Sequence, residues 1–174
     1  MIISVAEAKK HIETELEYTV LEAKLQALEL LVRRYTNNNF QMRNIRFQCP
    51  IMATKLYLST PFLSVNDTIQ ITESMYSEGI YTIKSMEDGF MMLDKSLFDE
   101  SEVLVTKVYY PMDVQMGVVN MLKWDLENRD KVGIQSETIS RHSVTYFNMD
   151  GDNSTMGYPK SLLGFLKPYM KARF

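Results

Sequence analysis

The stretch from Pro111 to Phe174 most constrains what this chain of 174 residues can fold into. Residues 111–130 carry apolar side chains at helical spacing after Pro111 and Asp113, so a helix is expected there, with Asp113 as its N-cap. Residues 131–158 are polar and rich in β-branched residues, and residues 159–174 return to helical spacing. A helix, a long arm and a terminal helix are typical of a component of an assembly, because such an arm buries little by itself.

The arm has no clean apolar face. Along residues 136–147, each face of an extended chain would carry both polar and apolar side chains. The pairing of such a strand is poorly specified by its own core. Two arrangements stay open: a hairpin laid over the chain's own helices, or a strand added to a neighbouring subunit's sheet. Our hypothesis is that the arm pairs subunits through Ser136, Thr138, Ile139, Arg141, Val144, Tyr146 and Phe147.

The terminal segment contains a proline inside its helical pattern. Pro168 lacks a backbone N–H, and its ring would press on the carbonyl of Gly164, so a kink or a stop is expected. The residues that follow are basic and aromatic. They predict a docking tail, with a frayed chain end as the other interpretation.

The first 40 residues predict two helices. Ser4 with Glu7 forms a capping box, so a short helix is expected to begin at Val5. From about Glu17 to Thr36, apolar residues alternate steps of four and three, and Asn37 to Asn39 end the helix. The apolar face consists of Leu21, Leu25, Leu28, Val32 and Tyr35, widened by Ala23, Ala27 and Leu30. This face packs in the core, or part of it meets a neighbouring subunit.

Residues 47–110 change character. Short segments rich in β-branched and aromatic residues (53–60, 67–74, 79–86, 90–94 and 103–110) alternate with turn residues, which predicts five or six antiparallel strands. Pro50 and Pro61 are expected at edges or strand starts. The predicted fold class is α+β: a helical frame of three to four helices (residues 1–46 and 111–174) with an inserted small antiparallel β barrel or sandwich (residues 47–110).

Composition and motifs argue against an enzyme. The formal net charge is −3 and the sequence pI is about 5.5, which disfavours a protein that grips nucleic acid by its phosphates. Cys49 is the only cysteine, and His11 and His142 lie far apart without metal-ligand spacing. We expect no catalytic residues, no metal, no cofactor and no membrane span. The reduced cytoplasm is the expected place of synthesis.

One rival from the residues is a nucleic-acid-binding module. Aromatic residues in the β segment, such as Tyr57, Tyr76, Tyr81, Phe90 and Tyr109, are of the kind that stack on bases. The many carboxylates of the same segment argue against this interpretation. A small hydrolase that uses Cys49 or a pair of aspartates is the other rival.

The order of the segments resembles the head–tail connector proteins (adaptor, or head-completion, proteins) of tailed bacteriophages. Four runs carry the resemblance: VAEAKKHI, RRYTNNNF, VGIQSETISRHSVTY, and the Tyr-Pro that opens YPKSLLGFLKPYMKARF. It covers residues 1–46 and 111–174. Residues 47–110 depart from the smaller members and resemble variants with an inserted β domain, whose role stays open between outer decoration and contact with capsid or tail.

The resemblance implies a structural virion protein at the head–tail junction, made in the host cytoplasm. Such adaptors assemble as a ring, usually dodecameric, on the portal protein, extend the DNA channel, and provide a platform for the next connector or tail protein. Double-stranded DNA would pass without specific binding. We assign portal docking, as a hypothesis, to Lys167, Tyr169, Met170, Lys171, Arg173 and Phe174. A stopper or tail-completion protein of the same junction is the closest alternative.

Overall fold

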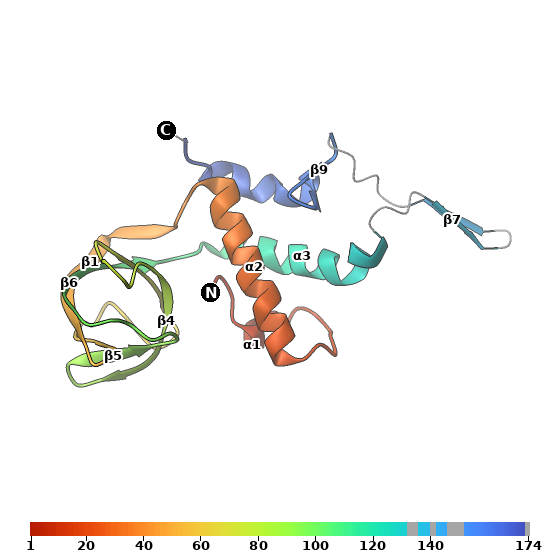
Figure 1. The fold of residues 1–174 in the computed structure, drawn as a ribbon. Helices are drawn as coiled ribbons and strands as arrows, with labels where there is room; N and C mark the ends of the chain where they lie inside the picture. The colour runs from red at the N-terminus through yellow and green to blue at the C-terminus, as the bar shows by residue number, and fades with distance from the viewer. Residues whose placement is uncertain (132–135, 140–141, 146–151, 173–174) are drawn as a thin grey trace. The chain divides into compact units, whose positions relative to one another are not determined.

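The computed structural model describes residues 1–131, 136–139, 142–145 and 152–172 (Figure 1). The chain divides into two compact units: a helical unit of Met1–Asn38 and Pro111–Phe174, and a β unit of Asn39–Tyr110. Helices occur together with a six-stranded antiparallel sheet, so the α+β class is confirmed. The β unit begins at Asn39 rather than at residue 47.

The first two helices follow the expected signals. In α1 (Val5–Ala8) the Ser4 hydroxyl accepts a hydrogen bond of 3.1 Å from the amide of Glu7. In α2 (Tyr18–Thr36) the stripe of Leu21, Leu25, Leu28 and Val32 is buried. Asn37 ends α2 in the left-handed conformation (φ 50°) that asparagine tolerates.

The predicted width of the apolar face of α2 was wrong in part. Ala23, Ala27 and Leu30 are exposed, so they do not join the core of the unit. Glu29, which is not among the residues of the predicted apolar face, is buried. Its Oε2 lies 3.5 Å from the terminal amine of Met1, and this charge explains how a carboxylate is accommodated there.

Helix α3 (Met112–Asn128) continues into a short 3₁₀ turn, η1 (Arg129–Lys131). Asp113 is not the N-cap, because Pro111 occupies that position. The Asp113 carboxylate instead accepts a hydrogen bond of 2.9 Å from the amide of Val114. A carboxylate in the first turn also complements the helix dipole.

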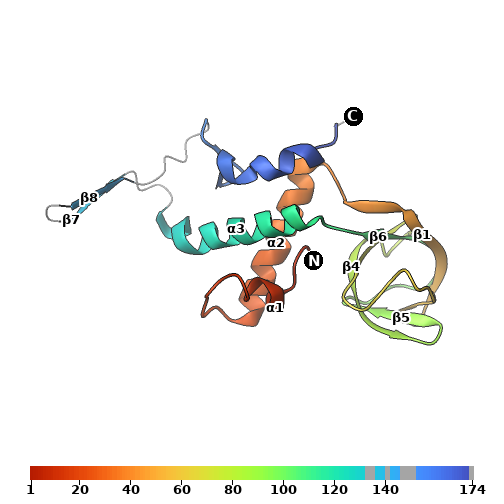
Figure 2. The same cartoon turned by 180° about the vertical axis from the view of Figure 1, so that it is seen from behind.

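The terminal segment forms a 3₁₀ helix, η2 (Lys160–Tyr169), and not an α-helix. Pro168 contributes to this geometry in the last turn, because it cannot donate to a carbonyl and its ring disfavours α-helical geometry over the preceding turn. The expected stop is confirmed, because Met170 is already extended (ψ 131°). Helix α2 crosses both α3 and η2, with which it packs (Figures 1 and 2).

Two short antiparallel pairs complete the helical unit. Strands β9 (Ser154–Thr155) and β10 (Tyr158–Pro159) precede η2. In the arm, β7 (Ser136–Ile139) pairs with β8 (His142–Thr145) as a hairpin, with Ser136 opposite Thr145 and Ile139 opposite His142. Arg141, Tyr146 and Phe147 of the predicted arm lie outside the described residues.

The β unit is a six-stranded antiparallel sheet whose strand order closes on itself. The order is β1-β2-β5-β4-β3-β6, and β6 pairs back onto β1 to make a closed barrel (Figure 1). The strands are β1 (Gln41–Met52), β2 (Lys55–Leu56), β3 (Thr68–Thr72), β4 (Gly79–Glu87), β5 (Phe90–Leu93) and β6 (Glu100–Val108). Ile51, Leu56, Ile69, Ile71, Ile83, Met91 and Val105 are among the fully buried residues of its interior.

Strand β1 is the longest strand of the sheet, and it was not predicted from the sequence. Its first half is polar, with Arg43 and Arg46 among its residues, so no alternating apolar signal marks it. Pro50 lies inside this strand, at a register shift between Cys49 and Ile51. Proline is tolerated at such irregularities because no ladder hydrogen bond is required of it.

The two ends of the β unit are tied together. The amide of Tyr109 donates a hydrogen bond of 2.9 Å to the carbonyl of Phe40, and the rings of Phe40 and Tyr110 pack at 5.0 Å. A segment whose ends meet can be inserted between two helices without separating them.

Gly117 of α3 provides a test of the helical packing. A Cβ at Gly117 would lie 2.3 Å from the ring of Phe165 in η2. Alanine favours a helix over glycine by about 1 kcal/mol, but overpacking costs about 1–3 kcal/mol. We therefore expect Gly117→Ala to lower the free energy of unfolding by about 1 kcal/mol in chemical denaturation.

Gly164 is the matched control, because a Cβ there meets nothing within 4 Å. Gly164→Ala should leave the free energy of unfolding unchanged or slightly raised. Adding Phe165→Leu to Gly117→Ala should recover part of the loss. Equal effects of the two alanine substitutions would contradict the close approach of η2 to α3.

Candidate functional site

Among residues 1–131, 136–139, 142–145 and 152–172, no group of three or more His, Cys, Asp or Glu side chains is arranged to hold a metal ion. In that same part of the chain, no helix combines the length and the hydropathy needed to span a membrane.

The predicted docking tail is partly built into the helical unit. Lys167, Met170 and Lys171 are exposed, whereas Tyr169 is half-buried. The Tyr169 hydroxyl donates to the Asp113 carboxylate at 2.7–2.8 Å. Arg173 and Phe174 lie outside the described residues.

The end of α2 holds the backbone of this tail. The carbonyl of Thr36 accepts a hydrogen bond of 2.8 Å from the amide of Lys171, and the side chains of Asn37 and Asn38 donate to backbone carbonyls of the tail. We call these contacts the C-terminal clasp: Thr36 to Lys171, Asn37 to Ala172 at 2.7 Å, and Asn38 to Tyr169 at 3.1 Å. The clasp fixes the chain through Ala172 and leaves the side chains of Lys167, Met170 and Lys171 facing solvent.

The clasp changes the interpretation of two sequence features. The run Asn37 to Asn39 was interpreted as a helix stop, and it also supplies two side-chain amides to the tail. The frayed-end interpretation fails for residues 169–172, because their backbone is held by hydrogen bonds. A deletion of residues 168–174 would remove the clasp, so it would confuse a loss of stability with a loss of docking.

A buried carboxylate in α3, Asp125, joins this helix to α2, to η1 and to the segment before η2. It was not predicted from the sequence. Asp125 is 8% exposed and accepts hydrogen bonds from Lys24 of α2 at 2.7 Å, from Arg129 Nε at 2.6 Å, and from the Tyr158 hydroxyl at 3.2 Å. Arg129 also donates to the carbonyl of Gly157 at 3.0 Å. Its guanidinium lies over the rings of Trp124 and Tyr158, 5.4 and 4.8 Å from their centroids.

The signal for Asp125 was present in the sequence. Val114, Val118, Met121 and Asp125 share one helical face, so a carboxylate interrupts an apolar stripe. A charge at such a position needs partners, and cations 101 residues earlier and 4 residues later provide them.

The protonation states in this network favour a structural role. Burial alone would raise the pKa of Asp125, but the hydrogen bonds and charges of Lys24 and Arg129 outweigh it, and the pKa lies below its ordinary value. Burial raises the pKa of the Tyr158 hydroxyl to about 12, and the Asp125 charge adds to the shift. Neither group is poised near neutrality, as a general acid or base needs to be.

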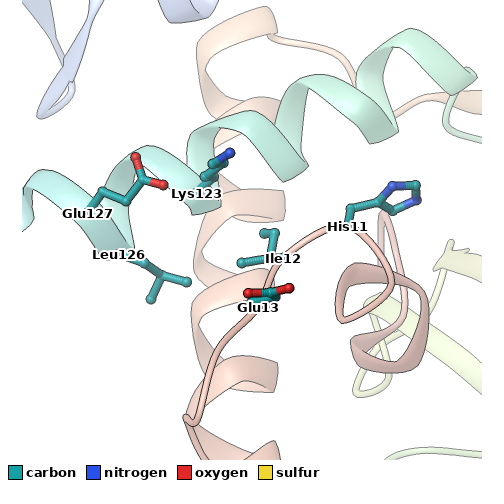
Figure 3. A pocket seen from close by; sticks show the side chains of 6 residues that line it. All are labelled: His11, Ile12, Glu13, Lys123, Leu126 and Glu127. Carbon is teal, nitrogen blue, oxygen red and sulfur yellow. The ribbon is translucent and has the colours of Figure 1, made fainter.

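Two hollows border the helical unit. The smaller, about 230 Å³, lies beside the network and is lined by Lys24, Ala27, Leu28, Leu31, Asp125, Arg129 and Tyr158. The larger, about 430 Å³, lies between the segment after α1 and the end of α3. In Figure 3 its histidine, His11, and the carboxylate of Glu127 lie at opposite sides, so they do not form an acid–base pair.

The aromatic residues proposed for base stacking do not form one platform. Tyr81 is buried, and its hydroxyl donates to the carbonyl of Ser77 at 2.9 Å. Tyr57 packs on Phe90 at 5.9 Å, and the ammonium of Lys55 lies 4.0 Å from the centre of the Phe90 ring. Tyr81 is therefore part of the barrel's own packing, whereas Tyr57, Tyr76 and Tyr109 remain 38%, 67% and 54% exposed.

The thiol of Cys49 faces the barrel core. The residue is buried, and burial raises the pKa of the thiol to about 11. Since the thiolate is the nucleophile, very little of the reactive form exists at neutral pH. This environment argues against a hydrolase that uses Cys49 as its nucleophile.

Replacement of Asp125 tests the network. A carboxylate with a lowered folded-state pKa stabilises the fold above its ordinary value of 3.8, and this stabilisation is lost as pH falls through the lowered pKa. Asp125→Asn should therefore cost about 2 kcal/mol at neutral pH, a typical scale for hydrogen bonds to charged groups. It should also flatten the loss of stability in acid.

Urea denaturation near neutral pH and in acid measures both effects. Asp130→Asn is the control, because Asp130 is exposed. If the two variants show the same pH dependence as the unmodified chain, Asp125 does not contribute through its charge.

Labelling of Cys49 tests the core of the β unit. A thiol-reactive dye should label the folded protein very slowly and should label it completely in denaturant, because the thiol is buried and protonated. The labelling rate followed against denaturant then reports unfolding of the barrel. Fast labelling of the folded chain at neutral pH would contradict this environment.

A scan of the sequence against models of protein families gave no match, and a search of curated proteins gave no relative.

Proposed function

We propose that this chain is a structural subunit of a bacteriophage head–tail junction: an adaptor that assembles as a ring on the portal protein. The ring extends the DNA channel and provides a platform for the next connector or tail protein. The proposal starts from the resemblance of residues 1–46 and 111–174 to the adaptors. In this role the subunit acts through contacts between proteins and needs no reaction, metal or cofactor.

One observation carries the proposal. Between α3 and η2 the chain forms a hairpin, β7–β8, which among the described residues is a sheet of two strands. A two-stranded sheet is marginally stable by itself, and both of its strands are edges with unpaired backbone groups. Addition of a neighbour's chain to such an edge would explain why a polar hairpin is placed between two helical segments.

The charge of the chain agrees with this role. A channel through which DNA slides has to avoid several simultaneous phosphate contacts, since each one adds salt-dependent affinity. The net charge of −3 fits a surface that DNA passes without being held. Portal docking is proposed for the tail, whose side chains Lys167, Met170 and Lys171 are exposed on a fixed backbone.

The test is the mass of the full chain in solution, measured by light scattering alone and with a candidate portal. We expect many copies to join each portal. A variant in which residues 136–145 are replaced by a short Gly-Ser linker should keep its thermal unfolding temperature but lose ring formation, because the pairing edges are gone.

The outcomes separate the alternatives. A chain that ignores the portal but binds a preassembled portal–adaptor complex would instead be a stopper or tail-completion protein. Oligonucleotide binding that falls steeply with salt would favour a nucleic-acid-binding module. If the linker variant forms rings as well as the unmodified chain, the hairpin does not pair subunits.

A further inference from the structure

One end of the barrel exposes three large apolar side chains together. Met75, Tyr76 and Phe98 are 84%, 67% and 65% exposed, and the Tyr76 and Phe98 rings pack edge to face at 6.1 Å. Met75 and Tyr76 lie between β3 and β4, and Phe98 lies between β5 and β6. Exposed carboxylates accompany them in the same two segments. We define the acidic–aromatic patch as Met75, Tyr76, Phe98, Glu73, Glu78 and Asp99.

The backbone under the patch is fixed by hydrogen bonds. The Glu100 carboxylate accepts from the Ser74 hydroxyl at 2.6 Å and from the Met75 amide at 2.7 Å. These contacts, the Ser74 hydrogen bond first, hold the pKa of Glu100 below its ordinary value, so the carboxylate stays charged. On the other side, buried Ser77 accepts from the amide of Phe98 through its hydroxyl at 3.1 Å.

A rigid loop that points apolar side chains into water has the properties of a binding surface. Exposed, clustered aromatic and methionine side chains are enriched in the centres of protein interfaces. Because the loop is already ordered, little conformational entropy is lost when a partner binds. The carboxylates around it repel nucleic acids and anionic lipids and attract a partner that carries basic groups beside apolar ones.

The same chain carries a segment with the complementary chemistry. The exposed side chains of Lys167, Met170 and Lys171 place two cations beside an apolar side chain. The C-terminal clasp holds the backbone of this segment, so it is ordered as well. The two lysines complement the charge of the patch carboxylates, and Met170 complements its apolar centre.

We propose that the acidic–aromatic patch of one copy binds the basic segment of Lys167, Met170 and Lys171 in the next copy. The contact joins two different surfaces, so it is heterologous, and repetition of a heterologous contact generates a ring when its rotation closes. The inference rests on the proposed ring and gives the basic segment a partner in the neighbouring subunit. Portal docking by the same side chains is the competing assignment.

A charge swap tests this contact in the full chain. The first variant is Glu78→Lys with Asp99→Lys, and the second is Lys167→Glu with Lys171→Glu. Self-association is measured by sedimentation at increasing protein concentration, in low and in high salt. All four positions are exposed, and Glu100 and the clasp residues stay unchanged. The control is Glu87→Lys with Asp88→Lys, at the exposed last residue of β4 and the first residue of the turn that follows it.

The expected pattern is specific. The unmodified chain and the control associate in low salt. Each charge variant alone associates more weakly, by about tenfold or more, because like charges then meet. An equimolar mixture of the two variants regains association, because each altered surface meets an altered partner. A chain that stays monomeric at every concentration, or a mixture that does not regain association, overturns the inference.

The apolar centre needs its own variant. Tyr76→Ser with Phe98→Ser should weaken association by a similar factor while the unfolding temperature stays within a few degrees of the unmodified chain. Portal binding, measured separately, distinguishes the two proposals. Lysine variants that lose only portal binding support the docking tail and overturn the inference. If the mixture of the two variants regains self-association but the unmodified chain does not bind the portal, the inference stands and the adaptor role is overturned.

Discussion

The helical unit depends on one buried carboxylate. Asp125 binds Lys24 of α2, Arg129 at the end of α3, and Tyr158 just before η2, so it joins segments that are separated by 101 and 33 residues. The β unit is inserted between the first two of these segments. Because the ends of the β unit meet at Phe40 and Tyr109, α2 and α3 can pack as though they were consecutive. The inserted barrel therefore adds a surface without interrupting the helical core.

Helices α1 and α2 were predictable because their signals are local. The α2 stripe, the Ser4 cap and the asparagine stop each depend on a few consecutive residues, and each appears in the structure. The close approach at Gly117 was also predictable, since a glycine in a helix interior needs a reason. Strand β1 was not, because its polar first half is held by pairing with β6, a contact between residues about 60 positions apart.

The candidate surfaces were only partly visible in the sequence. Composition identified the basic tail, but its anchoring by Thr36, Asn37 and Asn38 depends on a contact across more than 130 residues. The acidic–aromatic patch was not predicted, because Tyr76 and Phe98 come together only when β3–β4 and β5–β6 are placed side by side. Hydrophobic periodicity and charge predict helices, strands and their apolar faces, whereas the contact between two loops depends on how the barrel arranges its strands.

Each of the two units orders an exposed surface: a basic segment held by the clasp and an apolar patch held by Glu100 and Ser77. We propose that copies of this chain form a ring on a portal. Electron cryomicroscopy of portal particles incubated with the full chain tests this ring most directly. We expect an added ring coaxial with the portal, with one copy for each portal subunit. Portal particles without added density, at a concentration where the chain is folded, would contradict it.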